Sequence, residues 1–142
     1  MTNRAFRQRS SYRVKRLYQG LRARVDEALD SLGLSMPQYG ALTVLEAEGL
    51  LSNAALARLN FVTPQTMLRI VASLESSGLI ERDLSGSGRS ARFKLSAEGR
   101  LKLEEAHPRV TKIEQQMVGG LAADEAAIFL QSLDRCAEAL ST

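Results

Sequence analysis

The sequence predicts a mainly α-helical chain with one small β-hairpin, in the order α-α-α-α-β-β-α-α. Apolar residues recur every three to four positions over long stretches, a spacing typical of helices that bury one face. Between two such regions, residues 79–95 change to strand-like segments around a Gly/Ser-rich tip. The chain has 142 residues, of which 44% are hydrophobic and 25% charged. These values predict one globular unit over residues 1–142.

The first predicted helix runs from about Arg9 to Leu32. Its apolar stripe consists of Val14, Leu17, Leu21, Val25, Ala28, Leu29 and Leu32. The formal net charge is only +3, but a basic run precedes the first acid, Asp26; its members are Arg4, Arg7, Arg9, Arg13, Lys15, Arg16, Arg22 and Arg24. Such an arm suits a polyanion such as nucleic acid. A solvated helix surface explains the charge equally well.

Capping residues predict where the next two helices begin. Ser35, with Gln38 three residues later, predicts a capping box that starts a second helix over "MPQYGALTVLEAE". Ser52 is predicted to cap a short third helix, "NAALARL". The tight turn "NFV" then joins this helix to a fourth.

The fourth predicted helix has Thr63 as its N-cap and Pro64 as its first residue. A backbone N–H at this position has no partner within the helix, so proline costs no hydrogen bond there. Gly78 is expected to end it in a left-handed conformation. Its buried side is predicted to contain Met67, Ile70, Val71 and Leu74.

Two strands and two helices complete the order. The segments "LIERD" and "ARFKL" flank the loop "LSGSGRS", with Ala91, Phe93 and Leu95 alternating against Arg92 and Lys94. Ser96 is predicted to cap a helix from Ala97 to about Val118, which Gly119-Gly120 ends. The apolar face of the last helix contains Phe129, Leu130, Leu133, Ala137 and Leu140.

Two helices joined by a tight turn and followed by a basic hairpin predict a winged helix-turn-helix over residues 35–96. Its second helix enters the DNA major groove with its N-terminal end first. Gln65, Thr66 and Arg69 are the candidates for base contacts, since Arg suits guanine and Gln suits adenine. Thr63 and the helix N-terminus at Pro64 suit a phosphate.

The hairpin supplies the remaining candidates for DNA contacts. Arg89 lies at the tip beside glycines and is expected to reach the minor groove, while Arg92 and Lys94 suit phosphates. Plain solvation explains Arg92 and Lys94 equally well.

The segments "LGLSMPQYGALTVLEAE", "LARLNFVTPQTMLRIVASLESSGLIER" and "KLSAEGRLKLEEA" resemble the MarR family of bacterial transcriptional regulators, over about residues 10–141. This resemblance implies a homodimer in which residues 10–32 and 97–141 supply the dimerisation helices. It further implies a repressor that binds double-stranded DNA and is released by a small ligand, often aromatic or anionic. The implied effector pocket involves Tyr12, Arg16, Met36 and Tyr39; packing in the core and in the dimer is the simpler explanation of the same residues.

Two positions depart from the family pattern. The wing tip has Ser87-Gly88-Arg89 where the family usually has Asp-x-Arg, so this wing lacks the acid that commonly holds the arginine. Phe61 stands in the turn where the family often has glycine. We expect Asn60 to supply the left-handed residue instead, since asparagine tolerates positive φ.

Other functions are less well supported. His107 is the sole histidine and Cys136 the sole cysteine, and we identify no catalytic constellation, metal site or cofactor. Cys136 is expected to be a buried structural thiol. We predict a cytoplasmic protein, because no signal peptide or membrane span is evident and one cysteine cannot form an internal disulfide. The alternative is a winged-helix module that binds protein rather than DNA.

Overall fold

The computed structural model describes residues 4–84 and 91–141. It confirms the predicted mainly helical order and adds two 3₁₀ turns and a short strand. The elements are η1 (Ala5–Gln8), α1 (Ser10–Leu29), η2 (Asp30–Leu32), α2 (Met36–Glu48), β1 (Leu51–Ser52), α3 (Asn53–Leu59), α4 (Pro64–Ser76), β2 (Ile80–Asp83), β3 (Arg92–Leu95), α5 (Ala97–Met117) and α6 (Ala123–Ala139).

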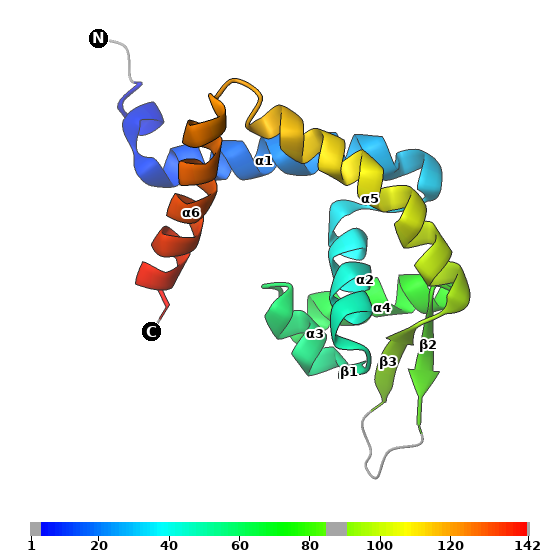
Figure 1. Cartoon of the computed structure of the whole chain (residues 1–142). Helices are drawn as coiled ribbons and strands as arrows, with labels where there is room; N and C mark the ends of the chain where they lie inside the picture. The colour runs from blue at the N-terminus through cyan, green and yellow to red at the C-terminus, as the bar shows by residue number, and fades with distance from the viewer. Residues whose placement is uncertain (1–3, 85–90, 142) are drawn as a thin grey trace.

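The molecule has two regions, one above the other in Figure 1. The long helices α1 and α5 lie side by side in the upper region, and α2, α3, α4 and the sheet form the lower one. One hydrophobic core joins the two regions, because Leu29 of α1, Leu42 of α2, Leu74 of α4 and Leu103 of α5 all belong to it. The lower region is thereby fixed against the helices above it.

Side-chain caps set the start of four helices where the sequence predicted them. Ser35 and Gln38 form the capping box of α2. The hydroxyls of Ser52, Thr63 and Ser96 accept N-terminal backbone N–H groups of α3, α4 and α5. These bonds satisfy donors that have no partner within a helix.

The sheet has the antiparallel order β1-β3-β2. In the hairpin, Ile80 pairs with Leu95 and Arg82 pairs with Phe93, and Phe93 and Leu95 are buried as the alternation predicted. The sequence did not predict β1. This strand has only two residues, too few to show an alternating pattern.

The last helix, α6, has no buried residue. Ile128, Leu130, Leu133 and Leu140 are all exposed in the single chain. The expectation that Cys136 is buried was therefore wrong, since its thiol is exposed on the same helix. The apolar face of α6 lacks a partner within the described chain.

Gly99, near the start of α5, marks the tightest backbone approach in the core. A Cβ atom at this position would collide with the carbonyl oxygen of Leu79 and lie 2.9 Å from Leu95 Cδ1. The buried Ser96 hydroxyl donates to the Gly78 carbonyl at 2.6 Å and accepts from the Gly99 N–H at 3.0 Å. The end of α4, the hairpin and α5 thus meet at a site that excludes any side chain at position 99.

We predict that Gly99→Ala destabilises the protein, whereas Gly20→Ala does not. The added methyl at position 99 has to displace backbone, and overpacking of this kind costs about 1–3 kcal/mol. A Cβ at Gly20 of α1 meets nothing within 4 Å, and alanine favours a helix interior by about 1 kcal/mol. Urea denaturation of both variants tests this, and equal stability of the Gly99→Ala variant and the wild type would contradict the close approach.

Candidate nucleic-acid interface

Helix α4 is buried on one side and open on the other. Met67, Val71 and Leu74 are buried, and Ile70 is partly buried against the same core. The predicted DNA-contacting residues of this helix are all exposed; they are Thr63, Pro64, Gln65, Thr66 and Arg69. The structure therefore places these five on one accessible surface at the N-terminal end of α4.

Local hydrogen bonds fix this end of α4. The Thr63 hydroxyl accepts the Thr66 N–H at 3.1 Å and lies 3.0 Å from the Thr66 hydroxyl. Asn53 of α3 donates from its side-chain amide to the Pro64 carbonyl at 3.0 Å. The two helices of the helix-turn-helix are thus held together at the exposed end.

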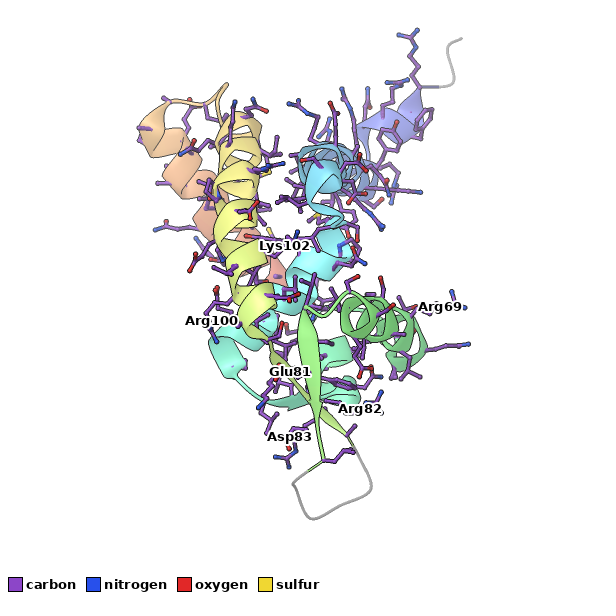
Figure 2. All side chains as sticks on the ribbon, turned by 90° about the vertical axis from the view of Figure 1, so that its right-hand side faces the viewer. Arg69, Glu81, Arg82, Asp83, Arg100 and Lys102 are labelled. Carbon is purple, nitrogen blue, oxygen red and sulfur yellow. The ribbon has the colours of Figure 1, made fainter. Side chains whose placement is uncertain are left out.

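Arg69 projects from α4 away from the body of the molecule (Figure 2). It follows Thr66 by three residues, so the two side chains share one face of the helix. A guanidinium in this position is free to make the paired hydrogen bonds that recognise guanine.

The hairpin is joined to α4 by Arg82, a residue that no sequence pattern indicated. Its guanidinium donates to both carboxylate oxygens of Glu75, at 3.2 and 2.9 Å, and lies 5.2 Å from the centre of the Phe93 ring. The hydrogen bond from Arg82 lowers the pKa of Glu75. Arg82 therefore helps to position the wing relative to the helix.

The predicted wing residues lie at different places. Arg92 and Lys94 are exposed on β3, and the Lys94 ammonium lies 3.9 Å from a carboxylate oxygen of Glu81 on the neighbouring strand. Arg89, with Ser87 and Gly88, lies outside the described residues.

A cavity of about 800 Å³ lies between α1, α2, the turn after α3, and α4. Tyr18, Met36 and Phe61 contribute apolar surface to it, and Arg22 and Arg69 are its cations. Its volume is within the usual range for small-molecule sites. Because Thr66 and Arg69 also line it, the cavity borders the exposed end of α4.

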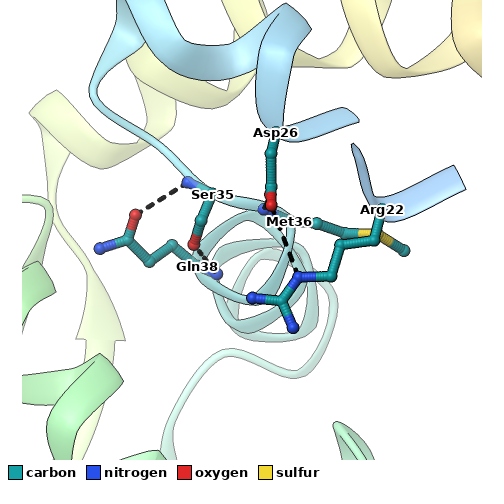
Figure 3. A network of polar contacts seen from close by, with 5 residues as sticks. All are labelled: Arg22, Asp26, Ser35, Met36 and Gln38. Atoms are coloured by element: carbon teal, nitrogen blue, oxygen red, sulfur yellow. Dashed lines mark hydrogen bonds and ion pairs between the residues drawn. The ribbon is translucent and has the colours of Figure 1, made fainter. Parts of the chain in front are cut away.

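A chain of hydrogen bonds connects α1 to α4 along this cavity. Asp26 of α1 accepts the Met36 backbone N–H at 2.6 Å and a bond from Arg22 at 3.5 Å (Figure 3). At the same end of α2, the Gln38 side chain accepts the Ser35 N–H at 2.9 Å and donates to the Ser73 hydroxyl of α4 at 2.9 Å. These bonds link α1 to the start of α2, and the first turn of α2 to α4.

The structure does not bring the four predicted effector residues together. Met36 lines the large cavity, whereas Arg16 lines a second cavity of about 490 Å³ between α1 and α5. Tyr12 packs edge-on against Phe6, with ring centres 4.9 Å apart. The Tyr39 hydroxyl lies 2.7 Å from Nδ1 of His107.

The contacts of His107 connect α5 to α2. Its Nε2 lies 3.0 Å from a carboxylate oxygen of Glu46, so both ring nitrogens have protein partners. Burial raises the pKa of Tyr39, with smaller contributions from Glu114 and Glu46. Within residues 4–84 and 91–141, no group of three or more His, Cys, Asp or Glu side chains is arranged to hold a metal ion.

Known proteins are similar to this chain in sequence and in architecture. The model of the MarR family matches residues 32–90. The HTH-type transcriptional repressor Rv2887 of Mycobacterium tuberculosis is 34% identical over 125 residues, covering 87% of this chain and 90% of the relative. The chain belongs to the MarR family.

Solved structures of that relative match the fold of this MarR protein. Rv2887 in complex with DNA has a TM-score of 0.76 at 30% identity, covering 90% of this chain and 97% of the other. Rv2887 in complex with salicylic acid has a TM-score of 0.75 at 33% identity, covering 90% and 96%.

The turn of this MarR helix-turn-helix differs from the sequence-based expectation. Phe61 has the positive φ, at 57°, whereas Asn60 has a φ of −102°. The Asn60 side chain and backbone N–H both donate to the Leu56 carbonyl, at 2.8 and 3.0 Å. These bonds hold Asn60 at the end of α3, so the chain reverses its direction at the next residue.

The described part of the chain contains no helix with the length and apolar character needed to cross a membrane.

Proposed function

We propose that this protein is a homodimeric, sequence-specific DNA-binding repressor of transcription that a small aromatic acid releases from its operator in the cytoplasm. The observation that carries the proposal is the accessible N-terminal end of α4, where Thr63, Gln65, Thr66 and Arg69 are exposed together. The similar protein Rv2887 has been solved in complex with DNA and in complex with salicylic acid, and this similarity supports the proposal.

Each exposed group has a role in this proposal. Gln65, Thr66 and Arg69 contact base edges in the major groove. Thr63 and the first turn of α4 at Pro64 contact a phosphate, because free N–H groups and the helix dipole favour an anion there. Arg92 and Lys94 contact the flanking backbone, and Arg89 at the wing tip contacts the minor groove.

Dimerisation is proposed from the apolar surface that the single chain leaves exposed. Val14 of α1 is 67% exposed, and Ile128 and Leu133 of α6 are 60% and 42% exposed. Large apolar side chains left exposed in a single chain are typical of a protein interface. A two-fold dimer presents two α4 helices, which suits a pseudo-palindromic operator with half-sites about 34 Å apart.

The effector is proposed to bind in the large cavity rather than across all four residues that the sequence suggested. Met36 and Tyr18 offer apolar surface to an aromatic ring, and Arg22 offers a cation to a carboxylate. A ligand here contacts both Arg22, which bonds to Asp26, and the Arg69 side chain of α4. It therefore favours an arrangement of α1, α2 and α4 that differs from the DNA-bound one.

Replacing the base-contacting arginine tests the DNA-binding role. We expect Arg69→Ala to lower affinity for an operator selected from random duplexes by about 1–3 kcal/mol and to relax the preference at one base pair. Fluorescence anisotropy measures both effects. Lys112→Ala, which removes an exposed cation from α5, is the charge-matched control. Unchanged affinity and preference after Arg69→Ala would show that Arg69 does not contact a base.

Disrupting the apolar face of α6 tests the dimer. We expect Leu133→Asp to give a monomer in sedimentation experiments and to weaken operator binding, because a buried charge without a partner opposes association. Gln131→Asp, on the polar side of the same helix, is expected to remain a dimer. A dimeric Leu133→Asp variant would show that α6 is not the interface.

Filling the large cavity tests the effector site. We expect salicylate to release the wild-type protein from its operator, and Met36→Trp to bind DNA normally but resist release because the indole occupies the ligand's space. Met117→Trp, which fills the smaller cavity instead, is the matched control. Resistance in Met117→Trp with normal release in Met36→Trp would place the effector beside Arg16 and contradict the proposed site.

A further inference from the structure

Phe61, in the turn between α3 and α4, combines two unfavourable features. It is the one residue other than glycine with a positive φ in the described part of the chain, at 57°. Its side chain is also 94% exposed, the largest value among the exposed large hydrophobic residues that the structure describes. Phenylalanine therefore suits neither the backbone conformation nor the surroundings of this position.

Phenylalanine adds no stability to the fold through either feature. A side chain in the left-handed region crowds the backbone, which is why glycine is preferred there. A ring in solvent gains nothing from burial. Residues held in such conformations cluster at functional sites, where the surrounding structure fixes them.

The backbone on both sides of Phe61 is held by hydrogen bonds. The Phe61 N–H donates to the Arg58 carbonyl at 3.3 Å, and the Val62 N–H donates to the Ala57 carbonyl at 3.1 Å. The turn therefore fixes the direction in which the Phe61 side chain leaves the backbone before any partner binds.

Phe61 lies beside the residues proposed to contact bases. It precedes Thr63 by two positions, so their Cα atoms are at most about 7.6 Å apart. Its side chain also borders the same cavity as Thr66 and Arg69. The turn that carries the ring thus directly precedes the end of α4 that is proposed to contact DNA.

We propose that Phe61 is a specificity-determining residue that packs its ring against the C5-methyl group of a thymine in the operator. This inference rests on the proposed DNA-binding function. The thymine methyl is the apolar group that base pairs present in the major groove, and phenylalanine is among the side chains that contact it. Binding would bury a ring that water surrounds in the free protein, which favours association.

Two substitutions separate the ring from the backbone conformation. Phe61→Ala removes the ring and keeps a Cβ at positive φ, whereas Phe61→Gly also removes the crowding. We expect both variants to bind the selected operator about tenfold more weakly, because each loses the apolar contact. We expect the Tm of Phe61→Gly to equal or exceed that of the wild type, because glycine suits this φ. A structural role would instead lower Tm and affinity together.

Replacing operator thymines by deoxyuridine, one at a time, identifies the partner group. At one thymine in each half-site, loss of the methyl is expected to weaken wild-type binding about fourfold and to leave Phe61→Gly binding unchanged. If removal of the methyl weakened the operator binding of the wild type and of Phe61→Gly equally, the proposed thymine contact would be wrong.

Two other outcomes are distinguishable. If the wild-type protein selects an operator and Phe61→Gly binds it with undiminished affinity, the inference about Phe61 fails while the DNA-binding function stands. Normal DNA affinity with loss of salicylate release would assign Phe61 to the effector cavity and would equally overturn the inference. If the wild-type protein selects no sequence, the proposed function itself fails.

Discussion

The burial of one side of α4 is the constraint on which the rest of the structure depends. Met67, Val71 and Leu74 are each no more than 2% exposed, so α4 is anchored and its opposite face has to remain open. This anchoring fixes Thr63, Gln65, Thr66 and Arg69 as a group rather than as independent side chains. A surface held in this way loses little conformational freedom when it binds, which favours affinity.

Hydrogen bonds also link α4, through α2, to the long helix α1. Asp26 of α1 holds the first N–H of α2, and Gln38 of α2 holds Ser73 of α4. The large cavity is bordered by these helices, so a molecule that enters it contacts the long first helix and the exposed helix at once. Coupling between two sites requires a connected element with two arrangements, and the α1–α2–α4 connection is the candidate for that element.

Patterns within single segments predicted most of the fold. The capping residues Ser35, Ser52, Thr63 and Ser96 marked the helix starts correctly, because a cap depends on residues only three positions apart. The predictions that were wrong concerned features that depend on contacts between distant segments or on competition between adjacent residues. Phe61 became the left-handed residue because the Asn60 side chain bonds back to Leu56.

Residues that act through other segments were also missed. Arg82 gave no signal in the sequence, since its partner Glu75 is identified only when the hairpin folds against α4. Cys136 was expected to be buried because α6 is amphipathic, yet α6 has no buried residue in the single chain. The four predicted effector residues were assigned to one pocket because of the helices that carry them. In the structure they have different neighbours, because the helix that carries a side chain does not determine which other segments that side chain contacts.

The most direct test of the account is a titration of the wild-type protein against an operator selected from random duplexes, with a scrambled duplex of equal length as control. We expect one dimer per operator, selective binding by about a thousandfold or more, and affinity that falls steeply with salt. Equal and weak affinity for the two duplexes at every salt concentration would contradict the claim that the exposed end of α4 recognises DNA sequence.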